Sequence, residues 1–230
     1  MQWLQNILEF DRNLFLSLNG RYTDWWDTAM LLFTRKETWL PLYLILIAVV
    51  IRNYRNKAWV ILLLMVLGVV VSDQVSGLIK DLTMRLRPGH DPLTQQLAHI
   101  VLRKGGLYGF VSSHAANSFF VFAFTAPLFR NRASFFTLLG WALIVSWSRI
   151  YTGAHFPLDV VGGWLLGILL GWLFFRILIF VETHFFVARF PQIGKTKLSR
   201  TNGALVFLTT ITVVTTVLLA VHILHKYQYL

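Results

Sequence analysis

The chain has 230 residues, of which 56% are hydrophobic and only 13% are charged, about half the charged share of a soluble globular domain. It carries nine tryptophans and nineteen phenylalanines, and several apolar runs approach the roughly 18 residues that mark a membrane-spanning helix. This composition excludes an ordinary soluble protein. It predicts an all-α, polytopic membrane helix bundle that forms one domain over residues 1–230.

The net charge of +11 would suggest nucleic acid as a partner if the protein were soluble. Here lysine and arginine flank the apolar runs, as they do at loops and lipid interfaces, so we expect the bilayer as partner and no nucleic acid. Because cysteine is absent, disulfides, thiol nucleophiles and thiolate metal sites are excluded. The redox compartment and the oligomeric state stay open.

Two N-terminal segments combine apolar positions at helical spacing with charged residues. In residues 3–18 the apolar pattern is interrupted by charges such as Asp11, which argues against a cleaved signal peptide. Residues 23–33, TDWWDTAMLLF, have a similar character. We expect both segments to be interfacial helices with tryptophans at the level of the lipid headgroups. A short spanning helix over residues 23–36 is the alternative.

Six spanning helices are predicted to follow. Their expected ranges are 38–51, 58–80, 114–129, 133–150, 157–181 and 203–225. The loops at 52–57, 130–132 and 183–203 fall on one side and hold nine of the 21 basic residues, so the positive-inside rule predicts that this side is cytoplasmic. The polar motifs described next are then expected on the outer, periplasmic face of a bacterial inner membrane.

Three polar clusters are expected to meet at that outer face. The first, KDLTMRLRP, contains Lys80, Arg87 and Pro88. Lys80 and Arg87 are seven residues apart, which is two helical turns, so they share a face if the helix continues until Pro88 ends it. Two cations that snorkel at a helix end are the alternative explanation of this cluster.

The second cluster, VSSHAANSF, begins a predicted spanning helix. Ser112 or Ser113 would be its N-cap, and the free N–H groups of a helix N-terminus can bind an anion. His114 follows in the first turn. Helix capping and a structural histidine are the alternative.

The third cluster, SRIYTGAHFPLDV, lies between two apolar runs. Arg149 ends one helix, Pro157 suits the first turn of the next, and His155 and Asp159 are four residues apart. If the turn around His155 is nearly helical, its side chain meets that of Asp159. A carboxylate bonded to one imidazole nitrogen fixes the tautomer and makes the other nitrogen a better nucleophile or base. A structural His–Asp pair is the alternative for this cluster alone.

Together the clusters supply three cations, two helix N-termini and two histidines. This set predicts a cradle for phosphoryl transfer, in which cations and N–H groups hold the phosphate oxygens, one histidine attacks and the other protonates the leaving oxygen. A metal site is the weaker alternative, because only Asp159 and Asp81 could add carboxylates to the histidines.

The three clusters resemble the motifs of the type 2 phosphatidic acid phosphatases, a family that shares its site with the vanadium haloperoxidases. The family pattern is lysine, six residues, arginine–proline; then proline–serine–glycine–histidine; then serine–arginine, five residues, histidine, three residues, aspartate. The first and third motifs are complete, and in the second Val111 replaces the proline and Ser113 the glycine. The matching residues are Lys80, Arg87, Pro88, Ser112, His114, Ser148, Arg149, His155 and Asp159.

The resemblance implies an integral membrane lipid phosphatase that needs no metal and no cofactor. It implies that His155 is the nucleophile that forms a phosphohistidine, that Asp159 orients it and that His114 is the general acid. The residues implied to hold the phosphate are Lys80, Arg87, Ser112, Ser113 and Arg149. Candidate substrates are undecaprenyl diphosphate, phosphatidylglycerol phosphate, phosphatidic acid and the phosphates of lipid A.

Two other functions are weighed against this one. A non-catalytic phospholipid transporter or scramblase would not need two histidines and a His–Asp pair, and haloperoxidases of this kind are soluble. Some polar residues also lie outside the motifs. Arg85, Arg103 and Lys104 either hold a second phosphate or a sugar headgroup, or are solvated loop cations. Asp73 and Gln74, inside a predicted spanning helix, are expected to make polar contacts between helices.

Overall fold

The computed structural model describes residues 2–101, 105–186 and 191–227, and these ranges contain eight α-helices and two short 3₁₀ helices. In chain order the elements are α1 (Gln2–Asn19), α2 (Asp24–Thr34), η1 (Lys36–Trp39), α3 (Leu40–Tyr54), η2 (Arg55–Lys57), α4 (Ala58–Thr83), α5 (Ser113–Phe129), α6 (Arg132–Tyr151), α7 (Pro157–Phe185) and α8 (Arg200–Lys226). No β-strand is present in these ranges, and the predicted all-α class is confirmed.

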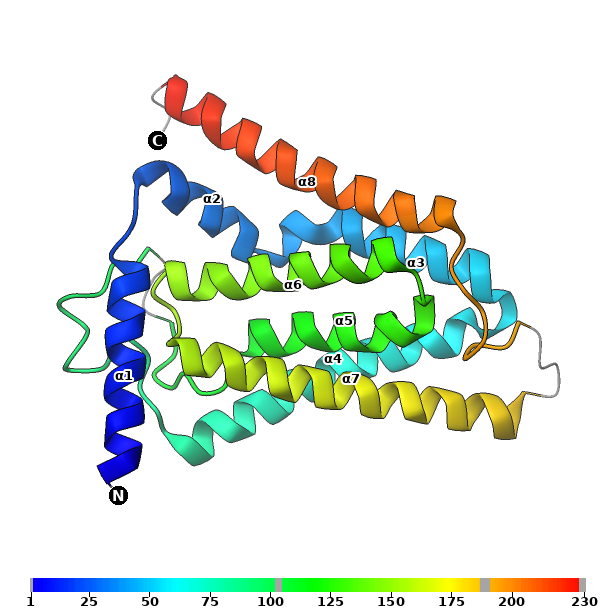
Figure 1. Cartoon of the computed structure of the whole chain (residues 1–230), viewed down its shortest axis with the longest axis horizontal. Helices are drawn as coiled ribbons and strands as arrows, with labels where there is room; N and C mark the ends of the chain where they lie inside the picture. Colours follow the sequence, from blue (N-terminus) through cyan, green and yellow to red (C-terminus); the bar gives the residue numbers. More distant parts are fainter. Residues whose placement is uncertain (1, 102–104, 187–190, 228–230) are drawn as a thin grey trace.

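The long helices α3 to α8 run roughly along the long axis of the molecule (Figure 1). Four helical segments are long and apolar enough to cross a bilayer. These segments are Lys36–Thr83, Arg132–Tyr151, Pro157–Phe185 and Arg200–Lys226. The first contains both α3 and α4, whereas the shorter α5 is not among the four. The membrane bundle is therefore confirmed, and the count of six spanning helices stays a prediction.

The connections between the helices lie at the two ends of this bundle. The turn between α3 and α4, the turn between α5 and α6, and the start of α8 lie at one end, on the right of Figure 1. The end of α4, the start of α5 and the connection from α6 to α7 lie at the other end. The three motif clusters thus share one end, as the alternation of helices predicts.

Helices α5 and α7 pack closely because glycines in α7 let the two backbones approach. A Cβ atom added to Gly167 would lie 2.3 Å from the carbonyl oxygen of Ala116, and one on Gly163 would lie 2.6 Å from that of Ser112. Both neighbours are backbone atoms of or next to α5, so neither can yield by rotating a side chain. The contact brings the N-termini of α5 and α7 together, and the N–H of Ser112 donates to the carbonyl of Asp159 at 2.8 Å.

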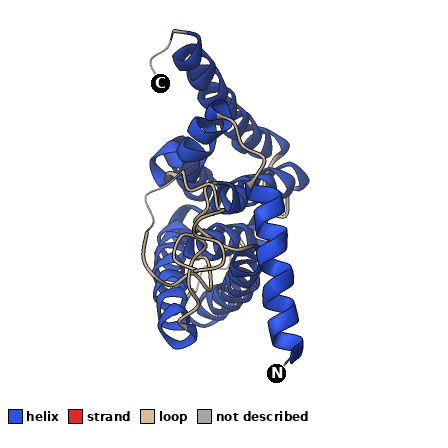
Figure 2. Ribbon diagram, turned by 90° about the vertical axis from the view of Figure 1, so that its left-hand side faces the viewer, coloured by secondary structure: helices blue, strands red, loops and turns tan. Residues whose placement is uncertain are grey.

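Helix α1 lies across the end of the bundle that carries the motifs (Figures 1 and 2). Its buried residues, Asp11, Phe15 and Asn19, are spaced by four and form one face, while Trp3 and Phe10 are exposed. This arrangement agrees with the expected interfacial helix, in which an apolar outer face lies among lipid headgroups.

Helix α2 differs from the expectation of a second interfacial helix. It packs against α6 and α8 and leads through η1 into α3, so it leans along the bundle and does not lie across its end. The reason is its apolar face, which buries Ala29, Met30 and Phe33 against these neighbours. Thr34, the last residue of α2, is also buried and contacts Arg149 at the end of α6.

Candidate active site

His155 and Asp159 meet where the chain turns from α6 into α7. His155 precedes α7, so the turn around it is not helical, yet its Nδ1 lies 3.4 Å from Oδ2 of Asp159. The N–H groups of Ala154 and His155 both donate to the carbonyl of Arg149, which tightens this turn. Oδ2 of Asp159 also accepts the N–H of Phe156 at 3.1 Å. Both side chains are buried, at 2% and 0% exposure. The predicted pair is therefore brought together.

Arg85 joins this pair to the N-terminal helix. Its Nη1 donates to Oδ1 of Asp159 at 2.7 Å, and its Nη2 pairs with Oδ2 of Asp11 in α1. The other oxygen of Asp11 accepts the N–H of Leu158 at 2.9 Å. The guanidinium also lies over the ring of Phe156, 4.7 Å from its centroid. Arg85 is thus held between two buried carboxylates, and the idea that it grips a second phosphate or remains a solvated cation is wrong.

Lys80 and Arg87 do not share a helical face. Helix α4 ends at Thr83, five residues before Pro88, because Met84 adopts a left-handed conformation with φ of 47°. Arg87 then lies in an extended segment, where its N–H donates to Leu107 and its Nε donates to the carbonyl of Tyr108 at 2.9 Å. Lys80 Nζ donates to Oγ of Ser113 at 2.6 Å. Lys80 therefore reaches the site from helix α4, and Arg87 reaches it from the extended segment that follows α4.

Arg149 is nearly buried at the end of α6. Its Nη1 donates to Oγ1 of Thr34 at the end of α2, while its Nε is buried and has no partner among the described residues. A buried guanidinium N–H without a partner has a strong tendency to bind an anion. The contact of Thr34 with Arg149 was not predicted, because nothing in the local sequence pattern indicates that α2 approaches α6.

The N-terminus of α5 provides the remaining polar groups. Ser112 is the N-cap residue, as expected, but its hydroxyl makes no capping hydrogen bond and has no partner in the described part of the chain. His114, in the first turn, interacts electrostatically with Arg149, His155, Arg87 and Lys80. The predicted site residues therefore gather at one place, although they come from four separate segments.

A cavity of about 470 Å³ opens beside this cluster. Its lining residues are Thr34, Arg35, Lys36, Glu37, Arg87, Gly89, Ile100, Gly105, His114, Arg149, Gly153 and Ala154. His155 and Asp159 are buried and do not line it, whereas the neighbouring Ala154 does. Burial lowers the pKa of His155 well below its ordinary value, and the nearby Arg149, Arg87 and Lys80 lower it further. The imidazole is therefore neutral at neutral pH.

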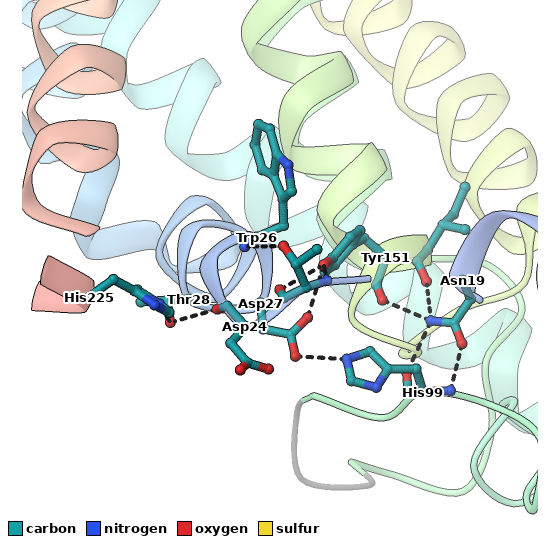
Figure 3. Close-up of polar contacts among 10 residues, drawn as sticks. Asn19, Asp24, Trp26, Asp27, Thr28, His99, Tyr151 and His225 are labelled. Carbon is teal, nitrogen blue, oxygen red and sulfur yellow. Dashed lines mark hydrogen bonds and ion pairs between the residues drawn. The ribbon is translucent and has the colours of Figure 1, made fainter. Parts of the chain in front are cut away.

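A second polar network holds the connection between α4 and α5 in place (Figure 3). Oδ1 of Asn19 accepts the N–H of His99, and Nδ2 donates to the carbonyl of Tyr151 at 2.8 Å. His99 Nε2 lies 2.8 Å from Asp27, which also accepts the hydroxyl of Tyr151 at 2.9 Å. The ring of Tyr22 stacks on that of His99. These contacts tie α1, α2 and the end of α6 to the connection between α4 and α5.

Other predicted groups lie elsewhere or cannot be placed. Arg103 and Lys104 lie outside the described residues. Asp73 and Gln74 are exposed on α4 and do not lie between helices, so the expectation of interhelical polar contacts is wrong. Within the described ranges, no group of three or more histidine, aspartate or glutamate side chains is arranged to hold a metal ion.

Comparison with known proteins gives concordant matches. A family model described as the PAP2 superfamily matches residues 57–182. The chain is 34% identical over 178 residues to a lipid A 4'-phosphatase of Bacteroides thetaiotaomicron, covering 76% of this chain and 79% of the relative. It is 30% identical to a lipid A 4'-phosphatase of Porphyromonas gingivalis, covering 82% and 81%. A shorter match, 33% identical, covers 37% of this chain and 43% of the undecaprenyl-diphosphatase BcrC of Bacillus subtilis.

Among solved structures, the fold is similar to that of a transmembrane PAP2-type phosphatidylglycerolphosphate phosphatase from Bacillus subtilis. The TM-score is 0.58 at 24% sequence identity, and the match covers 75% of this chain and 86% of the other.

Proposed function

This chain belongs to the PAP2 superfamily, and on that premise we propose that it is an integral membrane lipid phosphatase, which hydrolyses a phosphate monoester or diphosphate of a lipid through a phosphohistidine. The observation that carries the proposal is the buried His155–Asp159 pair, with Arg87, Arg149 and His114 around the adjoining cavity. The names of the relatives, which act on lipid A and undecaprenyl diphosphate, support a lipid phosphate as the substrate.

In the proposed reaction His155 is the nucleophile. Its Nδ1 faces Asp159, which leaves Nε2 to attack phosphorus, and the N–P bond forms as the P–O bond to the lipid breaks. His114 donates a proton to the departing oxygen. Water then attacks the phosphohistidine, His114 takes up a proton from that water, and inorganic phosphate leaves with His155 restored.

The same proposal assigns the phosphate-binding residues. Negative charge in a phosphoryl-transfer transition state is spread over three oxygens, so several positive groups must surround it. Lys80, Arg87 and Arg149 supply the cations, and the backbone N–H of Ser113 supplies a donor at the N-terminus of α5, whereas the N–H of Ser112 already donates to Asp159. The buried Nε of Arg149 and hydroxyl of Ser112, which lack partners in the described residues, are available donors for the phosphate.

For the membrane arrangement we propose six crossings, by α3 to α8, in a single domain over residues 1–230. Helix α5 packs against α4, α6 and α7. Because these helices separate it from lipid, it needs less apolar surface than the lipid-facing helices. The basic loops at the far end support a cytoplasmic location for that end, and so they support the proposal that the candidate site lies on the outer, periplasmic face of a bacterial inner membrane.

The test is phosphate release by the purified protein in detergent from a panel of the four candidate lipids. The His155→Ala variant is expected to lose activity completely, and radiolabelled substrate is expected to leave acid-labile, alkali-stable phosphate on wild type and not on His155→Ala. His184→Ala is the matched control, because His184 is an exposed histidine near the end of α7 far from the site. Binding of lipid phosphate without release by wild type would instead indicate a transporter or scramblase.

The role of His114 is tested separately through the leaving group. A well-placed general acid contributes roughly 10²–10⁴-fold when an alkoxide must leave, and little when an activated aryl phosphate leaves as a stable anion. His114→Ala should therefore lose most activity on lipid monoesters, less on diphosphates and least on the aryl phosphate. Equal losses in kcat/KM on all three would assign His114 to binding.

A further inference from the structure

The cavity beside the candidate site is lined by more residues than those proposed to hold one phosphate. Part of its lining, Arg87, His114 and Arg149, belongs to the proposed phosphate site. Another part comes from the junction of α2 and η1, residues 34–37. Its volume of about 470 Å³ is larger than the volume that the five heavy atoms of one phosphate group occupy.

The α2–η1 junction is held in a fixed position relative to the phosphate site. The hydroxyl of Thr34 accepts a hydrogen bond from Nη1 of Arg149, so the junction begins at a phosphate-binding arginine. On its other side, the hydroxyl of Thr38 donates to Leu32 at 2.7 Å and the indole of Trp39 donates to Phe33 at 2.9 Å. These hydrogen bonds close the turn and present the residues between them to the cavity.

The first two residues after Thr34 in this turn, Arg35 and Lys36, are cationic. Arg35 and Lys36 are exposed, and neither takes part in an ion pair within the described ranges. Among the described residues that line the cavity, Glu37 is the single carboxylate and faces four cationic side chains, two of them in the phosphate site. A bound phosphate carries at most two negative charges, and Lys80, Arg87 and Arg149 already oppose it. The cavity therefore has a surplus of positive charge that attracts a further anion.

We propose that Arg35 and Lys36 bind a second phosphate group of the same substrate molecule, so that the preferred lipid carries two phosphates. This inference rests on the proposed function and narrows its substrate class. The second phosphate is either the neighbouring phosphate of a diphosphate or a separate phosphate elsewhere on the headgroup. Arg85 is not available for this task, because Asp11 and Asp159 hold its guanidinium.

The test compares lipids with one and two phosphates. The substrates are phosphatidic acid, undecaprenyl diphosphate and a disaccharide lipid phosphorylated at both ends, each assayed in the same detergent with Arg35→Gln, Lys36→Gln and the double variant. A charge-assisted hydrogen bond makes about a tenfold difference in affinity, so each single variant should raise the KM of a two-phosphate lipid about tenfold. The KM for phosphatidic acid should stay within about twofold of wild type.

Arg21→Gln is the matched control, since Arg21 is an exposed arginine at the same end of the molecule that does not line this cavity. A KM effect on the diphosphate alone would identify the neighbouring phosphate as the ligand, and an effect on the disaccharide lipid alone would identify the distant one. Equal effects on all three lipids, or no effect on any, would overturn the second subsite.

Inhibition by inorganic ions gives a second measurement that needs no lipid. Wild type should be inhibited more strongly by pyrophosphate than by phosphate, and the double variant should lose most of that preference. An unchanged preference in the double variant would also overturn the proposal. Failure of the proposed function is distinguishable, because wild type would then release no phosphate from any of the lipids.

Discussion

Replacement of Arg85 by leucine is expected to destabilise the protein strongly. The arginine lies between Asp159 and Asp11, whose side chains are 0% and 1% exposed, and it is itself 17% exposed. Its removal leaves two buried carboxylates without their cation, and breaking a buried ion pair from one side costs about 3–5 kcal/mol. At about 2–4 °C per kcal/mol for a chain of this size, Tm should fall by about 6–20 °C, measured by tryptophan fluorescence of the purified protein.

The pH dependence of this loss has a definite sign. Burial raises the pKa of Asp11 above its ordinary value despite the ion pair with Arg85, and removing the arginine raises it further. At pH 7.5 the variant must keep an unpaired charge buried, whereas toward pH 5 the carboxyl can take up a proton. The difference in Tm between wild type and Arg85→Leu should therefore be largest at neutral pH and shrink as the pH falls.

The neighbouring ion pair of Arg12 with Asp91 provides the control. It also joins α1 to the segment after α4, but Arg12 is 30% exposed, and such a pair contributes about 0–1 kcal/mol. Adding Asp11→Asn to Arg85→Leu should recover part of the lost stability, because one of the two unpaired charges is then gone. If Arg85→Leu is no more harmful than Arg12→Leu, the buried network is not a source of stability and the reasoning fails.

Three further outcomes are expected. As the pH falls below about 6.5, wild type should lose stability relative to His155→Gln by up to about 1.4 kcal/mol per pH unit. The reason is that His155 takes up a proton in the unfolded chain but not in the folded protein, where burial lowers its pKa. Parallel curves of stability against pH for the two proteins would contradict this. Gly167→Val should lower Tm through contact with the α5 backbone, whereas Gly140→Ala, with open space around its Cβ, should not. In intact cells, a cysteine at the exposed Leu107 should react with an impermeant thiol reagent and one at Lys195 should not; the reverse pattern would place the candidate site in the cytoplasm.

The parts of the site that are local in sequence were the parts that could be predicted. The His155–Asp159 pair depends on a spacing of four residues, and Pro157 starts α7 as its fixed φ angle favours. The end of α4 could not be predicted, because a left-handed Met84 has no propensity signal and the bridge between Leu86 and Tyr108 that continues from it is a long-range contact.

The contribution of the N-terminal helices was missed for a related reason. Asp11 was noted as a charge that interrupts an apolar pattern, but its spacing of four residues from Phe15 indicates that it belongs to the buried face of α1. A carboxylate on such a face needs a buried partner. That partner, Arg85, is 74 residues away along the chain, and only the fold brings them together.

The glycine contacts between α5 and α7 have a consequence for how such an enzyme can diversify. Helices α5 and α7, whose N-termini carry His114 and follow His155, touch backbone to backbone, so a side chain added at Gly163 or Gly167 would shift one histidine relative to the other. We therefore expect substitutions at these two glycines to be selected against. Arg35, Lys36 and Glu37 at the α2–η1 junction line the cavity without taking part in that contact, so they can change independently of it. New headgroup preferences can arise there while the reaction itself is inherited unaltered.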